Sequence, residues 1–187
     1  MRAAVMNGIR EPLTVQEIKE PELRSDGVIV QVEANGICRS DWHAWTGDWS
    51  WFGLKLTFPH VLGHEFCGVV VETAPGVTRV KKGDRVLVPF SQGEGTCDSC
   101  RNGQHHVCDR RVTPGINYWG GFGRYVSVPF ADVNLVKLPA SIGFVEAASM
   151  GCRFMTSFHA LVDRAKVAAG EWVWREGPGR WSKASRC

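Results

Sequence analysis

The chain has 187 residues, of which 44% are hydrophobic and 22% are charged, a composition typical of a globular protein with one well-buried core and too short for two full domains. Its formal net charge is +3, but residues 171–187 contribute +2 of this through four Lys or Arg against two Glu, so the charge does not indicate nucleic-acid binding. No stretch approaches the roughly 18 apolar residues of a membrane span, and the first residues lack the pattern of a signal peptide. We therefore expect a cytoplasmic protein with no membrane and no nucleic-acid partner.

The first two thirds of the chain predict a series of short β-strands. Apolar residues alternate at Val28, Val30, Val32 and Ala34, which is typical of a half-buried strand. The expected strands lie at residues 2–6, 13–18, 28–34, 66–73, 85–90, 123–128 and 133–137, separated by turns rich in Gly, Pro and Asp. We expect a mainly β (α+β) fold with a barrel-like domain.

The pattern changes in the last quarter of the chain. Apolar residues recur there at helical spacing, which predicts an amphipathic helix from Cys152 to about Lys166. Gly170 ends this segment, and residues 171–174 are expected to form one strand. From Arg180 onward the sequence has no apolar periodicity.

The cysteines indicate metal binding rather than disulfides. There are seven of them, an odd number at a density below that of a disulfide scaffold, in a chain without a secretory signal. Cys97, Cys100 and Cys108 lie within twelve residues of one another. Such crowding favours a shared metal ion.

A second candidate metal site joins residues that are distant in the sequence. The thiolates of Cys38 and Cys152 and the imidazole of His64 would suit three-residue ligation of zinc, with the fourth position open for water or substrate. Any one of these residues alone would be expected to be a buried thiol or a hydrogen-bonded core histidine.

Several motifs in the same order resemble one family. Residues 38–43 (CRSDWH), together with a segment from Gly63 that fits G-H-E-x2-G-x5-A-x2-V, closely resemble the zinc-dependent alcohol dehydrogenases of the medium-chain dehydrogenase/reductase family. The resemblance runs from Met1 to about Trp172. It implies a GroES-like zinc-binding catalytic domain at residues 1–150, an interdomain helix and first strand of a Rossmann domain at 151–174, and an aberrant tail at 175–187.

The resemblance also assigns roles around the first metal site. It implies that Cys38, His64 and Cys152 hold the catalytic zinc, and that Glu65 is a carboxylate able to approach the metal during ligand exchange. Further roles follow by position: Asp41 orients the ligand histidine, Ser40 and His43 relay a proton to solvent, Arg39 contacts the cofactor pyrophosphate, and Trp45, Trp49 and Phe90 line the substrate pocket.

The family's second zinc site is only partly matched. Its structural lobe uses four cysteines at C-x2-C-x2-C-x7-C, and here Glu94 takes the first place ahead of Cys97, Cys100 and Cys108. A carboxylate donates less strongly to zinc than a thiolate, so we expect a retained but weaker site. His105 or His106 could complete the site instead, and three reduced thiols in a mobile lobe are the remaining alternative.

The implied activity is oxidation of a small-molecule alcohol to an aldehyde or ketone, by hydride transfer to NAD or NADP through a zinc alkoxide. Full-length family members are homo-oligomeric. The alternative function is a non-enzymatic zinc-binding module that acts with a partner chain.

The cofactor-binding part of the family is not recognisable. Residues 177–182 (GPGRWS) match only the start of the glycine-rich G-x-G-x-x-G turn, and a nucleotide-binding domain would need on the order of 100–150 further residues. We expect the chain to be truncated and inactive alone, on the hypothesis that a frameshift follows Glu171. The residue that would distinguish NAD from NADP is not identifiable.

Overall fold

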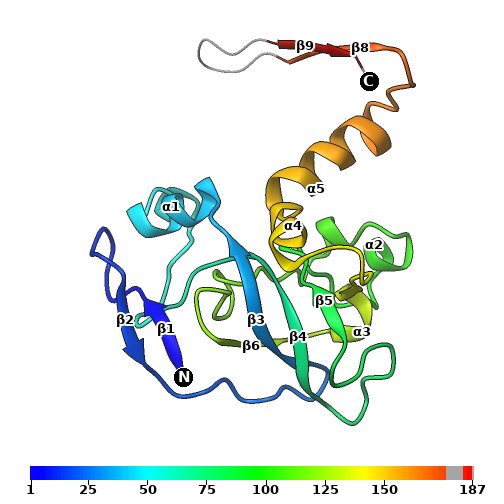
Figure 1. The fold of residues 1–187 in the computed structure, drawn as a ribbon. Helices are drawn as coiled ribbons and strands as arrows, with labels where there is room; N and C mark the ends of the chain where they lie inside the picture. The colour runs from blue at the N-terminus through cyan, green and yellow to red at the C-terminus, as the bar shows by residue number, and fades with distance from the viewer. Residues whose placement is uncertain (176–182, 187) are drawn as a thin grey trace. The chain divides into compact units, whose positions relative to one another are not determined.

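The fold of the first 152 residues is built around a five-stranded antiparallel sheet (Figure 1). The computed structural model describes residues 1–175 and 183–186. The strand order is β6-β3-β4-β5-β7, with bounds β3 (Val28–Gly36), β4 (Glu65–Thr73), β5 (Arg85–Leu87), β6 (Tyr125–Val128) and β7 (Val136–Lys137). Strands β1 (Arg2–Val5) and β2 (Thr14–Glu17) form a separate antiparallel pair. The mainly β fold class expected from the sequence is confirmed.

The core forms on one face of β3 and β4, the two longest strands. Val28, Val30, Phe66 and Val70 are fully buried in it, because alternate residues of a strand point to the same face. The β3–β4 register shifts between Ile29 and Val30 and again between Val32 and Ala34. Such irregularities bend and twist a strand, which favours a curved sheet.

Short helical segments connect the strands. The α-helices are α1 (Arg39–Thr46), α2 (Asp98–Arg101), α3 (Ala131–Asn134), α4 (Phe144–Ser149) and α5 (Cys152–Phe158); 3-10 turns lie at η1 (Ser50–Phe52) and η2 (His105–Val107). Helix α4 packs against β3 and β4 through Ala147 and Ala148. None of the helices in the described residues is long and apolar enough to cross a membrane.

Three expected elements differ from the structure. The strand at 133–137 is wrong in its first half, where α3 ends at Asn134 and only β7 is extended. The strand at 85–90 ends at Leu87, since Pro89 follows and lacks the N–H that a sheet requires. The helix expected to run to Lys166 is an α-helix only to Phe158 and continues as the π-helix η3 (His159–Arg164).

The chain divides into two compact units, Met1–Cys152 and Arg153–Cys187. The second contains most of α5, then η3, and a hairpin of β8 (Trp172–Arg175) with β9 (Lys183–Arg186), in which Trp172 pairs with Arg186. The strand expected at 171–174 is therefore present, whereas β9 was not expected. The glycine-rich turn considered at 177–182 lies outside the described residues.

We expect Asp132→Asn to lower the free energy of unfolding by about 1 to 2 kcal/mol. The Asp132 carboxylate accepts hydrogen bonds from the backbone N–H groups of Thr78 and Arg79, both at 2.8 Å, and thereby fastens α3 to a distant loop. Although burial opposes its charge, these hydrogen bonds lower the pKa of Asp132 below its usual 3.8. The stabilisation is thus present above that pH and is lost as pH falls below about 4.

Urea unfolding at pH 7 and pH 3 measures this effect, with Glu72→Gln as the control because Glu72 is an exposed carboxylate on β4. Equal stability of Asp132→Asn and the wild type at pH 7 would contradict the assignment.

Candidate metal centres

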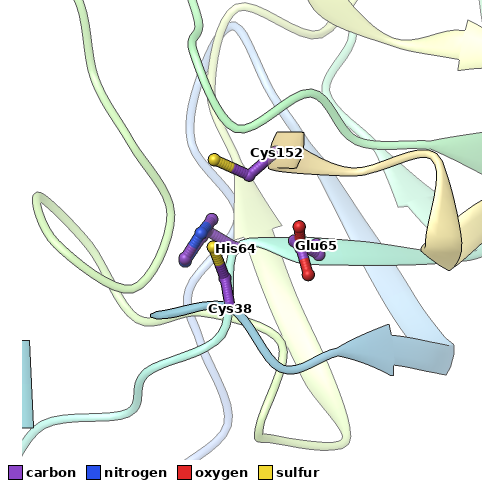
Figure 2. A group of neighbouring side chains, drawn as sticks. All are labelled: Cys38, His64, Glu65 and Cys152. Carbon is purple, nitrogen blue, oxygen red and sulfur yellow. The ribbon is translucent and has the colours of Figure 1, made fainter. Parts of the chain in front are cut away.

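The first candidate metal group is assembled by the pairing of β3 with β4 (Figure 2). Gly36 at the end of β3 lies opposite Glu65 at the start of β4. Cys38 follows β3 by two residues and His64 precedes β4 by one, so the antiparallel register brings them together. Cys152, the first residue of α5, completes the group from a third segment.

The ligand atoms of these residues are close enough to share one ion. One atom each from Cys38, His64, Glu65 and Cys152 all lie within 4.8 Å of one another. Cys38, His64 and Glu65 are buried, with exposed fractions of 5%, 2% and 2%. Among the described residues no Lys or Arg forms a salt bridge with Glu65, and a buried carboxylate is usually either paired or bound to a metal.

The hydrogen bonds of His64 test whether this group fits a metal. Its Nδ1 lies 3.0 Å from Oδ1 of Asp41, which leaves Nε2 for other partners. Nε2 is buried and has no hydrogen-bond partner. An imidazole held through one nitrogen by a carboxylate, with the other nitrogen unpaired near two thiols, is the usual arrangement of a zinc-binding histidine. The residues present therefore fit zinc.

Asp41 connects the segments that carry the ligands. Besides His64, its Oδ1 accepts a hydrogen bond from the backbone N–H of Gly63 at 3.1 Å, and its Oδ2 accepts one from the backbone N–H of Cys38 at 2.9 Å. Cys38 is the N-cap of α1, and Asp41 lies in the first turn of that helix. One buried carboxylate thus fixes both the start of α1 and the orientation of the ligand histidine.

In the absence of metal, this environment favours the charged forms of His64 and Cys38. Burial opposes a charge on His64, but the hydrogen bond to Asp41 and the adjacent thiols raise its pKa to about 11. Burial likewise opposes ionisation of Cys38, yet a hydrogen bond from the backbone N–H of Ser40 and the charge of the adjacent His64 lower its pKa. A metal ion would replace the imidazolium proton and keep the thiolate, as zinc ligation requires.

Two glycines allow the close approach of the ligand segments. Gly63, immediately before His64, has a φ of 98°, a left-handed conformation that side chains disfavour. A Cβ at Gly151 would lie 2.5 Å from Cβ of Glu65, closer than any real contact. A side chain at position 151 would therefore force either Glu65 or the segment before Cys152 to shift.

A cavity of about 280 Å³ adjoins this metal group. Its walls combine side chains of the group with apolar ones from distant loops: Ser40, Trp49, Phe52, Leu54, His64, Phe90, Arg111, Thr113, Ile116 and Cys152. Trp49 and Phe90 were expected here, whereas Phe52, Ile116 and Arg111 were missed because no motif marks them. Trp45 is not among these wall residues. Its indole Nε1 donates to the carbonyl oxygen of Glu11 at 2.6 Å, and it packs on Met6 and Leu62.

The expected proton relay is only partly assembled. Ser40 lines the cavity, and Nδ1 of His43 lies 3.0 Å from Oδ2 of Asp48 while its ring packs near Trp49. Within the described part of the chain no hydrogen bond joins Ser40 to His43. The guanidinium of Arg39 lies 4.5 Å from the ring centroid of Trp42. The roles expected of Ser40, His43 and Arg39 therefore stay predictions.

A second candidate metal group lies in the lobe around α2. Ligand atoms of Glu94, Cys97, Cys100 and Cys108 all lie within 4.8 Å of one another, and the sulfurs of Cys97 and Cys108 are 3.7 Å apart. Neither His105 nor His106, the alternatives considered from the sequence, belongs to this group. Three thiols and a carboxylate are a donor set that zinc accepts.

Glu94 is held in place before any metal binds. Its carboxylate accepts hydrogen bonds from the hydroxyl of Thr96 at 2.5 Å and from the backbone N–H of Cys97 at 2.6 Å, and it lies 3.0 Å from the guanidinium of Arg110. The Thr96 hydroxyl contributes most to lowering the pKa of Glu94 to about 2. Glu94 is therefore ionised, as a ligand must be.

Comparison with known proteins gives consistent similarities. Residues 24–140 match the model of the alcohol dehydrogenase GroES-like domain. The chain is 40% identical over 175 residues to an alcohol dehydrogenase of Geobacillus stearothermophilus, and the aligned residues cover 92% of this chain and 50% of that relative. It is 38% identical over 168 residues to an NAD-dependent alcohol dehydrogenase of Saccharolobus solfataricus, covering 86% of this chain and 47% of that relative.

Solved structures show the same similarity. The alcohol dehydrogenase TADH from Thermus sp. ATN1 superposes with a TM-score of 0.82 at 31% identity, covering 91% of this chain and 49% of that one. A cobalt- and zinc-bound thermostable alcohol dehydrogenase from Pyrobaculum aerophilum gives a TM-score of 0.80 at 30% identity, covering 91% and 50%. The GroES-like architecture expected from the sequence is confirmed. The chain spans about half the length of the relatives it matches.

We expect the purified chain to bind two zinc ions, one for each metal group. The double variant Cys38→Ser/Cys152→Ser should retain one ion, and so should Cys97→Ser/Cys108→Ser, because each change removes two thiolates from a single group. Metal content by mass spectrometry after dialysis measures this. Cys67→Ala is the control, since Cys67 is a buried thiol outside both groups. Unchanged zinc content in either double variant would contradict the corresponding site.

Proposed function

Because the chain belongs to the family of alcohol dehydrogenases with a GroES-like domain, we propose that its first metal group is the catalytic centre of a zinc-dependent alcohol dehydrogenase. The observation that carries the proposal is the buried, unpartnered Nε2 of His64 beside two thiols and an apolar cavity. The reaction is oxidation of an alcohol to an aldehyde or ketone, with NAD or NADP as hydride acceptor.

Cys38, His64 and Cys152 would hold the zinc, and Glu65 would serve as an alternative ligand. When bound there, zinc acts as a Lewis acid that makes the hydroxyl of an alcohol more acidic. The second group, with Glu94 as one ligand, would hold a structural zinc that stabilises its lobe. Because Glu94 takes the place of a fourth thiolate, this site should bind zinc more weakly than a lobe with four cysteines would.

The side chains of the cavity would position and deprotonate the alcohol. Trp49 and Phe90 present apolar surface that favours the carbon skeleton and excludes water. Ser40 lies in the same wall, where its hydroxyl would accept the alcohol proton and pass it toward His43. Asp48 lies 3.0 Å from Nδ1 of His43 and would hold the ring in position for this transfer.

The cofactor would lie next to the same cavity, since hydride transfer requires the nicotinamide ring to contact the alcohol carbon. Arg39, at the start of α1, would contact its pyrophosphate. In the proposed organisation, residues 1–150 form the catalytic domain and residues 151–174 the helix and strand that lead to the cofactor domain.

A chimera tests the proposal. The part of this chain that aligns with the NAD-dependent relative from Saccharolobus solfataricus replaces the matching half of that enzyme. The chimeric protein is then assayed for reduction of NAD by benzyl alcohol. We expect turnover that His64→Ala abolishes. Ser40→Ala should lower kcat by about 100-fold or more because it removes the proton acceptor.

Cys67→Ala is the matched control and should retain the turnover of the parent chimera. A folded, zinc-loaded chimera that does not reduce NAD with any alcohol would contradict the proposal. It would favour the alternative, a zinc-binding module without catalysis.

A further inference from the structure

One wall residue of the cavity beside the first metal group carries a full positive charge. Outside the metal group, the described lining is apolar apart from the hydroxyls of Ser40 and Thr113, and Arg111 is the one cation among these residues. A purely apolar alcohol would gain nothing from an arginine in this position. The residue therefore bears on which alcohols the site accepts.

The fold fixes the backbone of Arg111. The neighbouring Val112 forms two backbone hydrogen bonds with Gln92, both at 3.0 Å, and the N–H of Arg111 donates to the carbonyl oxygen of Cys108 at 3.0 Å. Gln92 is itself fully buried. The lobe with the second metal group thus presents Arg111 to the cavity of the first.

The guanidinium of Arg111 has donors to spare. It donates one hydrogen bond, to the carbonyl oxygen of His106 at 3.2 Å, out of the five N–H groups that arginine carries. Within residues 1–175 and 183–186 no carboxylate lies within ion-pairing distance of it. The adjacent Arg110, in contrast, is paired with Glu94 at 3.0 Å.

We infer that the alcohol accepted by this site carries a carboxylate at the end remote from its hydroxyl, and that Arg111 binds this carboxylate. The inference rests on the proposed function and specifies its substrate class. The hydroxyl would lie toward Ser40 and the metal group, the apolar body between Trp49, Phe52 and Phe90, and the carboxylate against the guanidinium. The planar fork of arginine matches a carboxylate through two parallel hydrogen bonds.

The size of the cavity is consistent with this class. At about 280 Å³ it lies near the lower end of small-molecule sites, so it suits a compound with one ring or a short chain. Two probes that differ only at the remote end are 4-(hydroxymethyl)benzoate and 4-methylbenzyl alcohol.

Calorimetric titration of the zinc-loaded chain with both probes tests the inference. We expect 4-(hydroxymethyl)benzoate to bind about tenfold more tightly than 4-methylbenzyl alcohol. The difference should shrink in high salt, because Arg111 is exposed and its charge is screened. Arg111→Gln should abolish the difference by weakening the binding of 4-(hydroxymethyl)benzoate, while Arg111→Lys should retain part of the difference.

Arg101→Gln is the matched control, since Arg101 is an exposed arginine of the same lobe that does not line the cavity, and it should retain the tenfold preference. Equal binding of the two probes, or a preference that survives in Arg111→Gln, would overturn the inference and leave the proposed function standing. Failure of both probes to bind would overturn the proposed function and this inference with it.

Discussion

The buried carboxylate of Asp41 is the constraint on which the first metal group depends. Its two oxygens accept hydrogen bonds from Cys38, Gly63 and His64, residues that belong to two separate segments of the chain. A buried carboxylate is stable only when its oxygens are hydrogen-bonded, so the carboxylate and the segments stabilise one another. The same contacts fix the tautomer of His64 and leave its Nε2 for a metal.

The sheet and the glycines make this arrangement possible. Pairing of β3 with β4 in the observed register brings the Cys38 and His64 segments into contact, and a shift by one residue would reverse every side chain. Gly151 then lets the start of α5 approach Glu65 closely enough for Cys152 to join the group. The ligands are thus placed by backbone features rather than by contacts among themselves, which is how a preorganised metal site is built.

Much of this could be predicted from the sequence, for identifiable reasons. Apolar residues alternate over residues 28–34 in β3 and form a run over residues 66–71 in β4, segments long enough for the pattern to be recognised. Cys38, His64 and Cys152 stand in motifs whose order and spacing are specific, so their grouping could be expected without coordinates. Helix α1 was missed because it has only eight residues without an apolar stripe; it is defined by the Cys38 cap and by Gly47 in the left-handed conformation.

Other features depend on contacts between distant residues and leave no local pattern. The sequence pattern predicts residues 133–134 as part of a strand, but the hydrogen bonds from Thr78 and Arg79 to Asp132 anchor a helical turn at α3. Arg111 reaches the cavity only because the adjacent Val112 pairs with Gln92. Both features depend on hydrogen bonds between residues far apart in the chain, which local sequence patterns do not reveal. Such tertiary contacts can override local propensity.

The central claim is that thiolates and one imidazole, brought together by the β3–β4 pairing, hold zinc at the first group. X-ray absorption at the zinc edge, on the Cys97→Ser/Cys108→Ser chain so that only this group is loaded, tests it most directly. We expect the zinc ion to have two sulfur neighbours at about 2.3 Å and an imidazole nitrogen at about 2.0 to 2.1 Å. A zinc shell of oxygen and nitrogen only, or one with four sulfurs, would contradict it.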